Sequence, residues 1–245
     1  MISVTILTKD SQKYLQQVLE PLAIFDEVVV YDTGSTDETL KIASEFANVT
    51  IHQGPFIGFG ATHNIASEAA KHDWILSIDS DEIATTELIA ELKNLKPHPQ
   101  QVFAIRRNNY FNGKWIKWCG WYPDYQIKLY NRKSTHYSDA QVHESILTNG
   151  MDLVHLTHPL KHYPYGSIND FLAKMQSYSA LFAKQYAGKR KSSLGKAIAH
   201  GIYAFFKSYI LKRGFLGGSE GFIISVYNGQ TAYYKYLKLL EINNK

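Results

Sequence analysis

The chain has 245 residues, a length that suits one sizeable domain or a domain with an appendage. Its single cysteine, Cys119, excludes an internal disulfide, and apolar runs such as residues 202–206 are too short to span a bilayer, so a cytoplasmic location is expected. The net charge of +4 is unevenly divided, because residues 1–100 carry 15 acidic and 6 basic side chains whereas the rest of the chain carries 7 and 20.

Three strand patterns separated by two helix patterns open the chain. Residues 2–7 and 27–31 are mostly β-branched and apolar, which predicts buried strands, and residues 49–51 predict a third, short strand. Ser35 and Glu38 match a capping box at the start of the second helix. This alternation of strands and helices indicates a parallel, right-handed, doubly wound α/β sheet.

Asp32 stands at the tip of the second predicted strand, where an open α/β sheet presents groups to ligands. Its carboxylate is suited to accept hydrogen bonds from the N–H or O–H groups of a nucleoside, and a turn residue is the alternative. The chain has neither a G-x-G-x-x-G cradle nor a G-K-[ST] loop, so classical dinucleotide and P-loop binding are not expected.

A glycine-containing loop at residues 54–60 leads into a helix predicted over residues 62–71. His63 and Asn64 would then lie in the first turn of that helix. Unpaired N–H groups and the helix dipole attract phosphate there, which predicts contacts with a diphosphate. A surface histidine is the alternative for His63.

The fourth strand pattern, residues 74–78, runs into Asp79-Ser80-Asp81-Glu82, which places three carboxylates within four positions. Clustered acids repel one another, so a folded protein keeps them where a cation lies between them. Mg²⁺ and Mn²⁺ prefer oxygen ligands and commonly bridge one or two carboxylates to phosphates. The run therefore predicts a divalent metal site, and an acidic loop before a helix from about Ala84 is the alternative.

Taken together, four features resemble the GT-A nucleotide-sugar glycosyltransferases of family 2: the strand-end Asp32, the G-S-T-D turn, the G-F-G-x-x-H-N helix start and the D-S-D-E run. The resemblance covers about residues 1–150 and implies a GT-A-like, doubly wound, mostly parallel (mixed) sheet. It implies Mg²⁺ or Mn²⁺ on the diphosphate of the donor. The metal ligands expected from it are Asp79, Asp81 and Glu82, and the residues expected to bind the nucleotide sugar are Thr8, Asp32, His63, Asn64 and Asp79.

Aromatic and basic residues follow a strand predicted over residues 102–107. The segment at residues 110–124 mixes Trp and Tyr with Lys, a composition suited to stacking on sugar rings or on nucleobases. Single-stranded nucleic acid is therefore a competing ligand for this segment. No RNP-like, KH-like or zinc-knuckle pattern is present, so no nucleic-acid partner is expected.

A second pattern links Pro123-Asp124, Lys128-Leu129-Tyr130-Asn131-Arg132 and Val142-His143-Glu144. It resembles the lipopolysaccharide inner-core heptose β-1,4-glucosyltransferase subgroup. An inverting sugar transfer needs a base near the acceptor hydroxyl, a role that suits a carboxylate. The resemblance makes Glu144 the first choice of base and Asp124 the second. It gives His143 a place in the metal shell or beside a phosphate, and a core histidine is the alternative.

Basic, aromatic-rich helices are predicted over residues 168–187, 194–212 and 219–241. No acidic residue occurs between Asp170 and Glu220, whereas nine basic residues do. Helices of this composition can lie in the interface of an anionic membrane. The alternative is a helical appendage that packs its aromatic residues on the domain or on a second copy of the chain.

The expected organisation is a nucleotide-sugar-binding half at residues 1–100, an acceptor-side part of the same domain at 101–165 and a C-terminal helical appendage at 166–245. The expected function is metal-dependent, inverting transfer of a hexose, glucose from UDP-glucose, to an inner-core heptose of lipid A-linked lipopolysaccharide. The enzyme would be cytoplasmic and peripherally associated with the inner membrane. The alternatives are another lipid-linked acceptor such as polyprenyl phosphate, or a non-catalytic sugar-nucleotide or glycan-binding module.

Overall fold

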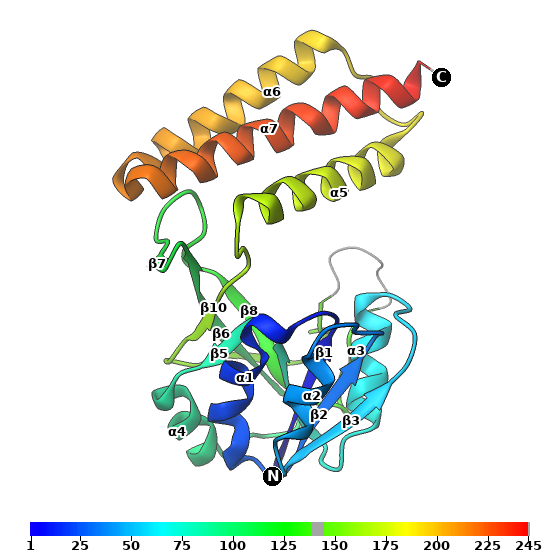
Figure 1. The fold of residues 1–245 in the computed structure, drawn as a ribbon, viewed down its shortest axis with the longest axis vertical. Helices are drawn as coiled ribbons and strands as arrows, with labels where there is room; N and C mark the ends of the chain where they lie inside the picture. Colours follow the sequence, from blue (N-terminus) through cyan, green and yellow to red (C-terminus); the bar gives the residue numbers. More distant parts are fainter. Residues whose placement is uncertain (139–144, 245) are drawn as a thin grey trace. The chain divides into compact units, whose positions relative to one another are not determined.

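The computed structural model of the protein describes residues 1–138 and 145–244 and divides the chain into two compact units (Figure 1). The α/β unit comprises Met1–Arg107 and Asp124–His162. The helical unit comprises Asn108–Pro123 and Tyr163–Lys245. The division of the chain by function stays a prediction.

A mixed sheet organises the α/β unit. Four neighbouring strands, in the order β3-β2-β1-β4, are parallel, and β8 then pairs antiparallel with both β4 and β6. The strands are β1 (Ile2–Thr8), β2 (Val28–Asp32), β3 (Val49–Gln53), β4 (Trp74–Asp79), β5 (Glu82–Ala84), β6 (Gln101–Phe111), β8 (Tyr125–Asn131), β9 (Asp152–His155) and β10 (Leu160–His162). The predicted α/β fold with a mixed, mostly parallel sheet is confirmed.

Both faces of β1, β2 and β4 are buried, whereas β3 at the edge of the sheet is partly exposed. Successive side chains of a strand point to opposite faces. On β2, Val28 and Val30 belong to one apolar cluster and Val29 to another. The first cluster also holds residues of α1 (Gln12–Leu19), the 3-10 helix η1 (Glu20–Ile24), α2 (Thr39–Ser44) and α4 (Thr86–Asn94). The helix α3 (Phe59–Glu68) contacts β1 and β2 as well. Burial of both faces explains why these strands are almost continuously apolar in sequence.

The starts of α2 and α4 differ from the predictions. Residue Glu38 occupies the N-cap of α2 without a capping side-chain hydrogen bond, and the Ser35 hydroxyl donates to Asp32, so the predicted capping box does not form. The helix α4 begins at Thr86 rather than near Ala84, because β5 is used for pairing with β10. Thr85 caps α4 by accepting a hydrogen bond from the Leu88 N–H at 3.2 Å.

In the helical unit, α7 packs against both α5 and α6. The elements are β7 (Lys114–Trp115), α5 (Ile168–Tyr186), α6 (Leu194–Phe206), the π-helical turn η2 (Lys207–Leu211), the 3-10 helix η3 (Gly214–Gly217) and α7 (Gly218–Asn243). A small core joins the 108–123 segment to these helices through Phe111, Ile116, Cys119, Phe171 and Ile224. The three helices predicted from sequence are confirmed. Within the described residues, none of the helices has the length and apolar character needed to cross a membrane.

Candidate active site

Three of the predicted site residues meet at the carboxyl edge of the parallel strands. Thr8 ends β1 and pairs in register with Asp32, the last residue of β2. On the other side of β1, Leu7 pairs with Asp79, the last residue of β4. The parallel topology therefore gathers Thr8, Asp32 and Asp79 at the edge where α/β sheets bind ligands.

Asp32 is fully buried, and its carboxylate organises the turn that follows β2. It accepts hydrogen bonds from the backbone N–H groups of Gly34 at 3.0 Å and Ser35 at 2.9 Å, from the Ser35 hydroxyl, and from the Thr8 hydroxyl at 3.0 Å. Burial alone would raise the pKa of Asp32, but these hydrogen bonds hold it below its usual value. In this structure both Asp32 and Thr8 make internal contacts, and their contacts with a nucleoside stay a prediction.

A network of ion pairs neutralises two acids of the D-S-D-E run. The Lys128 Nζ lies 3.0 Å from Asp79 Oδ2 and 2.7 Å from Glu82 Oε2. The Arg107 guanidinium lies 3.4 Å from Glu82 Oε1 and 3.9 Å from Asp79 Oδ2. The cation that clustered carboxylates require is thus supplied in part by the protein itself.

Burial and charge set the protonation of this network. Burial would raise the pKa of Asp79, but the charge and hydrogen bond of Lys128 together with the nearby His63 and His162 hold that pKa well below its usual range. For Glu82, burial and the nearby charge of Asp79 raise the pKa. Burial would lower the pKa of Lys128, but Asp79 and Glu82 raise it, so the ammonium stays charged.

Asp79 and Glu82 differ in their access to solvent. The Asp79 side chain is 40% exposed, whereas that of Glu82 is 0% exposed and also accepts a hydrogen bond from the Asp79 N–H at 2.9 Å. Glu82 therefore stabilises the carboxyl end of β4 from inside the protein. Its role as a metal ligand stays a prediction.

Asp81 lies beside a histidine that the sequence patterns did not single out as a ligand. Its Oδ1 is 3.5 Å from His162 Nε2, and its side chain is 34% exposed. The antiparallel pairing of β10 with β5 brings them together, because it sets His162 opposite Glu82. Burial and the charge of Arg107 lower the pKa of His162 to about 3, so the imidazole is neutral, the form that binds metals.

The Asp81–His162 pair fits a hard divalent cation. Mg²⁺ in nucleotide enzymes commonly takes one or two protein ligands and completes its shell with phosphate oxygens and water. Within residues 1–138 and 145–244, no three acidic, histidine or cysteine side chains are grouped closely enough to hold a metal ion. His143, the predicted additional metal ligand, lies outside the described residues.

His63 and Asn64 do not lie in the first turn of their helix. The helix α3 begins at Phe59, three residues before the predicted start, so both residues fall in its second turn and the prediction of their position was wrong. His63 is buried, stacks on Tyr137 with 4.4 Å between ring centroids, and places Nδ1 3.2 Å from the Ser77 hydroxyl. Burial lowers the pKa of His63 to about 4.

Asn64 also makes internal contacts. Its amide donates to the Tyr137 carbonyl at 3.0 Å and accepts from the Tyr137 N–H at 2.9 Å. His63 and Asn64 together hold the chain at Tyr137, immediately before residues 139–144. Their contacts with the donor stay a prediction.

Of the two predicted bases, only Asp124 lies among the described residues. Its Oδ2 accepts hydrogen bonds from Arg107 Nε at 2.9 Å and Nη2 at 2.8 Å, and its Oδ1 accepts one from the Gln126 amide at 2.9 Å. A carboxylate engaged in this way by a guanidinium is a poor proton acceptor. Glu144 lies outside the described residues.

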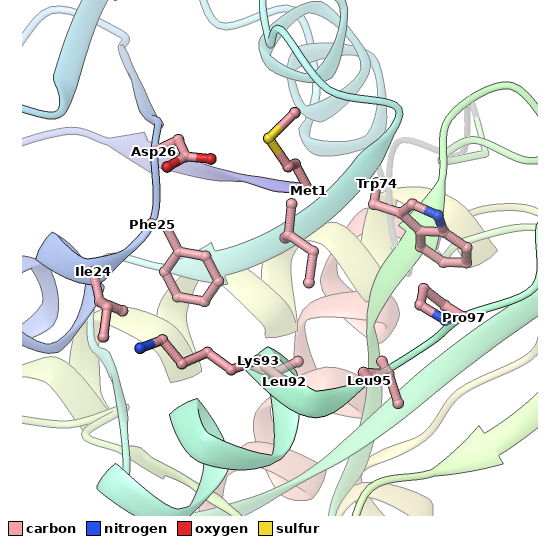
Figure 2. A pocket seen from close by; sticks show the side chains of 10 residues that line it. Met1, Ile24, Phe25, Asp26, Trp74, Leu92, Lys93, Leu95 and Pro97 are labelled. Carbon is pink, nitrogen blue, oxygen red and sulfur yellow. The ribbon is translucent and has the colours of Figure 1, made fainter.

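A cavity of about 280 Å³, lined by apolar side chains and by Asp26 and Lys93, lies in a different part of the α/β unit (Figure 2). Its lining includes Ile2 and Trp74, the first residues of β1 and β4, together with Phe25 and Leu95. It therefore lies at the amino ends of the strands, opposite the edge that carries Asp79. The polar residues considered above take no part in it.

Comparisons of the sequence with known proteins identify its relatives. Residues 3–151 match the family model described as Glycosyl transferase family 2. An uncharacterized glycosyltransferase of Rickettsia bellii is 27% identical, over 99% of this chain and 87% of the relative. The lipopolysaccharide core biosynthesis glycosyltransferase LpsC of Rhizobium meliloti is 25% identical, over 94% of this chain and 90% of LpsC.

A solved structure has the same fold. The crystal structure of S. aureus TarS in complex with UDP-GlcNAc aligns with a TM-score of 0.54 and 17% identity, over 99% of this chain and 89% of the TarS chain. The expected GT-A type of architecture is thereby confirmed.

Proposed function

Because the chain belongs to glycosyl transferase family 2, we propose that it is a metal-dependent, inverting hexosyltransferase that moves glucose from UDP-glucose to an inner-core heptose of lipopolysaccharide. The observation that carries the proposal is the Asp81–His162 pair, which follows the strand end where Lys128 and Arg107 neutralise Asp79 and Glu82. That pair offers a partly exposed carboxylate and a neutral imidazole to a cation and its phosphate ligands.

The donor would bind at the carboxyl edge of β1, β2 and β4. Asp81 and His162 would hold Mg²⁺ or Mn²⁺, which when bound supplies positive charge to the diphosphate leaving group. Lys128 and Arg107 keep Asp79 and Glu82 ionically paired, so that the edge presents a fixed arrangement of charges rather than mutually repelling acids. The TarS structure contains UDP-GlcNAc, which supports a UDP-sugar as the first donor to test.

Transfer with inversion requires that a carboxylate removes the proton of the acceptor hydroxyl while that oxygen attacks the anomeric carbon. The engagement of Asp124 by Arg107 supports Glu144 as this base. Asp124 would then act as a positioning residue that fixes Arg107 beside Glu82.

The lipopolysaccharide acceptor is supported by the likeness to LpsC, whose name assigns it to lipopolysaccharide core biosynthesis. An acceptor of this kind is anchored to a membrane by its lipid A part. We therefore place the enzyme at the cytoplasmic face of the inner membrane, in peripheral association. Polyprenyl phosphate is the alternative acceptor, and a transfer assay with each acceptor distinguishes the two.

The donor assignment is tested by the thermal stability of the full chain with UDP-, GDP-, ADP- and CMP-sugars, each with and without Mn²⁺. Binding to the folded state at about a hundred times the dissociation constant stabilises it by about 2.7 kcal/mol, which raises the melting temperature measurably. We expect the largest shift with UDP-glucose and Mn²⁺ together, followed by transfer to a heptose-containing core acceptor. The absence of a shift with every donor would contradict the proposal.

A further inference from the structure

The helix α6 has two apolar faces, and α7 covers one of them. The covered face includes small residues. Ala197 is fully buried, and a Cβ added to Gly201 would lie 3.0 Å from the Tyr233 Cβ and 3.3 Å from the Gly229 carbonyl oxygen. Figure 1 shows α6 running along α7 over most of its length. The two helices therefore approach closely at small residues, and Phe205 also faces α7, because its Cβ would lie 3.1 Å from a Cβ added to Gly229.

The uncovered face carries large apolar side chains at four-residue spacing. Side chains four residues apart on a helix are neighbours, so they form one stripe that continues from α6 into η2. Their exposed fractions lie between 42% and 66%. The members of this α6 stripe are Leu194, Ile198, Ile202, Phe206 and Ile210. A contiguous exposed apolar surface of this kind marks an interaction site.

The charged side chains of the segment that carries the α6 stripe have a single sign. No Asp or Glu occurs between Asp170 and Glu220, a segment that includes the whole of α6, η2 and η3. Lys207, Lys212 and Arg213 are exposed at the carboxyl end of the stripe. Phe215 and Leu216, which follow them, are exposed as well. A surface that carries both basic and apolar side chains is complementary to a partner that has anionic groups on its outside and an apolar interior.

We propose that the α6 stripe docks on the surface of a membrane that contains anionic lipids. Ile198, Ile202 and Phe206 enter the boundary between headgroups and acyl chains, while Lys207, Lys212 and Arg213 meet the lipid phosphates. The inference goes beyond the transfer reaction and does not depend on it, because every residue that carries it belongs to the helical unit.

A lipid surface fits the α6 stripe better than a second copy of the chain. In a two-fold dimer the same patch lies on both sides of the interface, so two surfaces from a segment with basic and no acidic side chains would face each other. Such like-charge clustering opposes association, whereas an anionic surface is attracted. Nucleic acid fits poorly too, because the aliphatic Leu194, Ile198 and Ile202 cannot stack on bases.

The test is co-sedimentation of the full chain with vesicles of phosphatidylcholine alone and of phosphatidylcholine mixed with phosphatidylglycerol. The wild-type chain should bind the mixed vesicles more tightly, and added salt should weaken that binding. The double variant Ile202→Gln, Phe206→Gln should bind at least about tenfold more weakly, because two large apolar side chains no longer leave water. Replacing Lys207, Lys212 and Arg213 by Gln should abolish the preference for phosphatidylglycerol.

A matched control removes two apolar side chains of similar exposure from another helix. Leu172 and Leu181 of α5 are 47% and 44% exposed, and their replacement by Gln should leave vesicle binding unchanged. Circular dichroism melting should show that every variant remains folded. Equal binding to both vesicle types, or equal loss in the α5 control, would overturn the proposal. The proposal would also be overturned if the wild-type chain were a dimer in sedimentation velocity, bound no vesicles, and became a monomer in the α6 double variant. That result would assign the stripe to a second copy.

Discussion

At the scale of single residues, the site depends on the ion pairs that neutralise its buried charges. Lys128 and Arg107 pair with Asp79 and Glu82 inside the α/β unit, and removal of one partner from such a network would leave an uncompensated buried charge. Asp81 lies beside His162, with its Oδ1 3.5 Å from His162 Nε2. Two of the acids thus hold the strand end through ion pairs, and Asp81 is the acid proposed to bind a metal.

His63 makes the stability of the α/β unit sensitive to acid. Its pKa is about 4 in the folded chain, below the ordinary value of 6.5, because it is buried. The unfolded chain therefore binds a proton that the folded chain excludes, so stability is lost as pH falls below about 6.5, and the loss is complete near the folded pKa. Between neutral pH and about pH 5, protonation of this one residue in the unfolded chain should lower the free energy of unfolding by about 2 kcal/mol.

The measurement is urea unfolding of the wild-type chain and of His63→Phe at both pH values. The variant should lose about 2 kcal/mol less than the wild type on acidification, whatever its stability at neutral pH. His98→Phe is the control, since His98 is exposed in the folded chain and its replacement should leave the acid-induced loss unchanged. An identical loss in the wild type and in His63→Phe would contradict the assignment.

The sequence was informative about some of these residues and silent about others, for a physical reason. Asp79 and Asp81 follow a strand directly, so the local pattern was enough to place them at the sheet edge. Lys128, Arg107 and His162 come from β8, β6 and β10. The antiparallel pairing of these strands cannot be predicted from the residues near the acids. Their roles depend on long-range register, which residue spacing alone does not reveal.

At the scale of elements, periodicity predicted the buried strands and the long helices well, and helix starts less well. The helix α3 was placed three residues late because Gly58, with φ of 109°, ends the preceding loop without a capping side chain to mark the boundary. That shift moved His63 and Asn64 from the predicted first turn to the second turn of the helix. Short-range signals therefore located this element and misplaced two residues within it, whose contacts with the donor stay a prediction.

The contact between α6 and α7 gives a prediction at this scale. A leucine at Gly201 would collide with Tyr233 and with the backbone at Gly229, so Gly201→Leu should destabilise the helical unit by about 1–3 kcal/mol. Gly195→Leu is a matched control on the same helix, because no atom lies within 4 Å of the added Cβ there. It should be neutral or stabilising by up to about 1 kcal/mol.

Circular dichroism melting of the two glycine variants checks this prediction. The melting temperature of Gly201→Leu should fall, while that of Gly195→Leu should stay or rise. Donor-induced stabilisation should persist in both, since the donor edge lies in the α/β unit. If both variants melted like the wild type, the close packing of α6 on α7 would be wrong.

At the scale of the whole molecule, the uneven charge seen in the sequence follows the two units. The acidic first hundred residues all belong to the α/β unit, which would bind a metal and a diphosphate. The acid-free segment between Asp170 and Glu220 lies in the helical unit, which would meet an anionic membrane. Composition could suggest this division, but only the fold shows that Leu194, Ile198, Ile202 and Phe206 of α6 stay exposed beside its contact with α7.

The central claim is that the D-S-D-E strand end binds a nucleotide sugar through a divalent metal. Its most direct test is calorimetric titration of UDP, with and without Mn²⁺, into the wild-type chain and into Asp81→Asn. Asp152→Asn is the control, because Asp152 is an exposed acid on β9 of the same unit. We predict Mn²⁺-dependent binding that Asp81→Asn weakens at least about tenfold and Asp152→Asn preserves. Equally tight, Mn²⁺-dependent binding of UDP by Asp81→Asn would contradict the account.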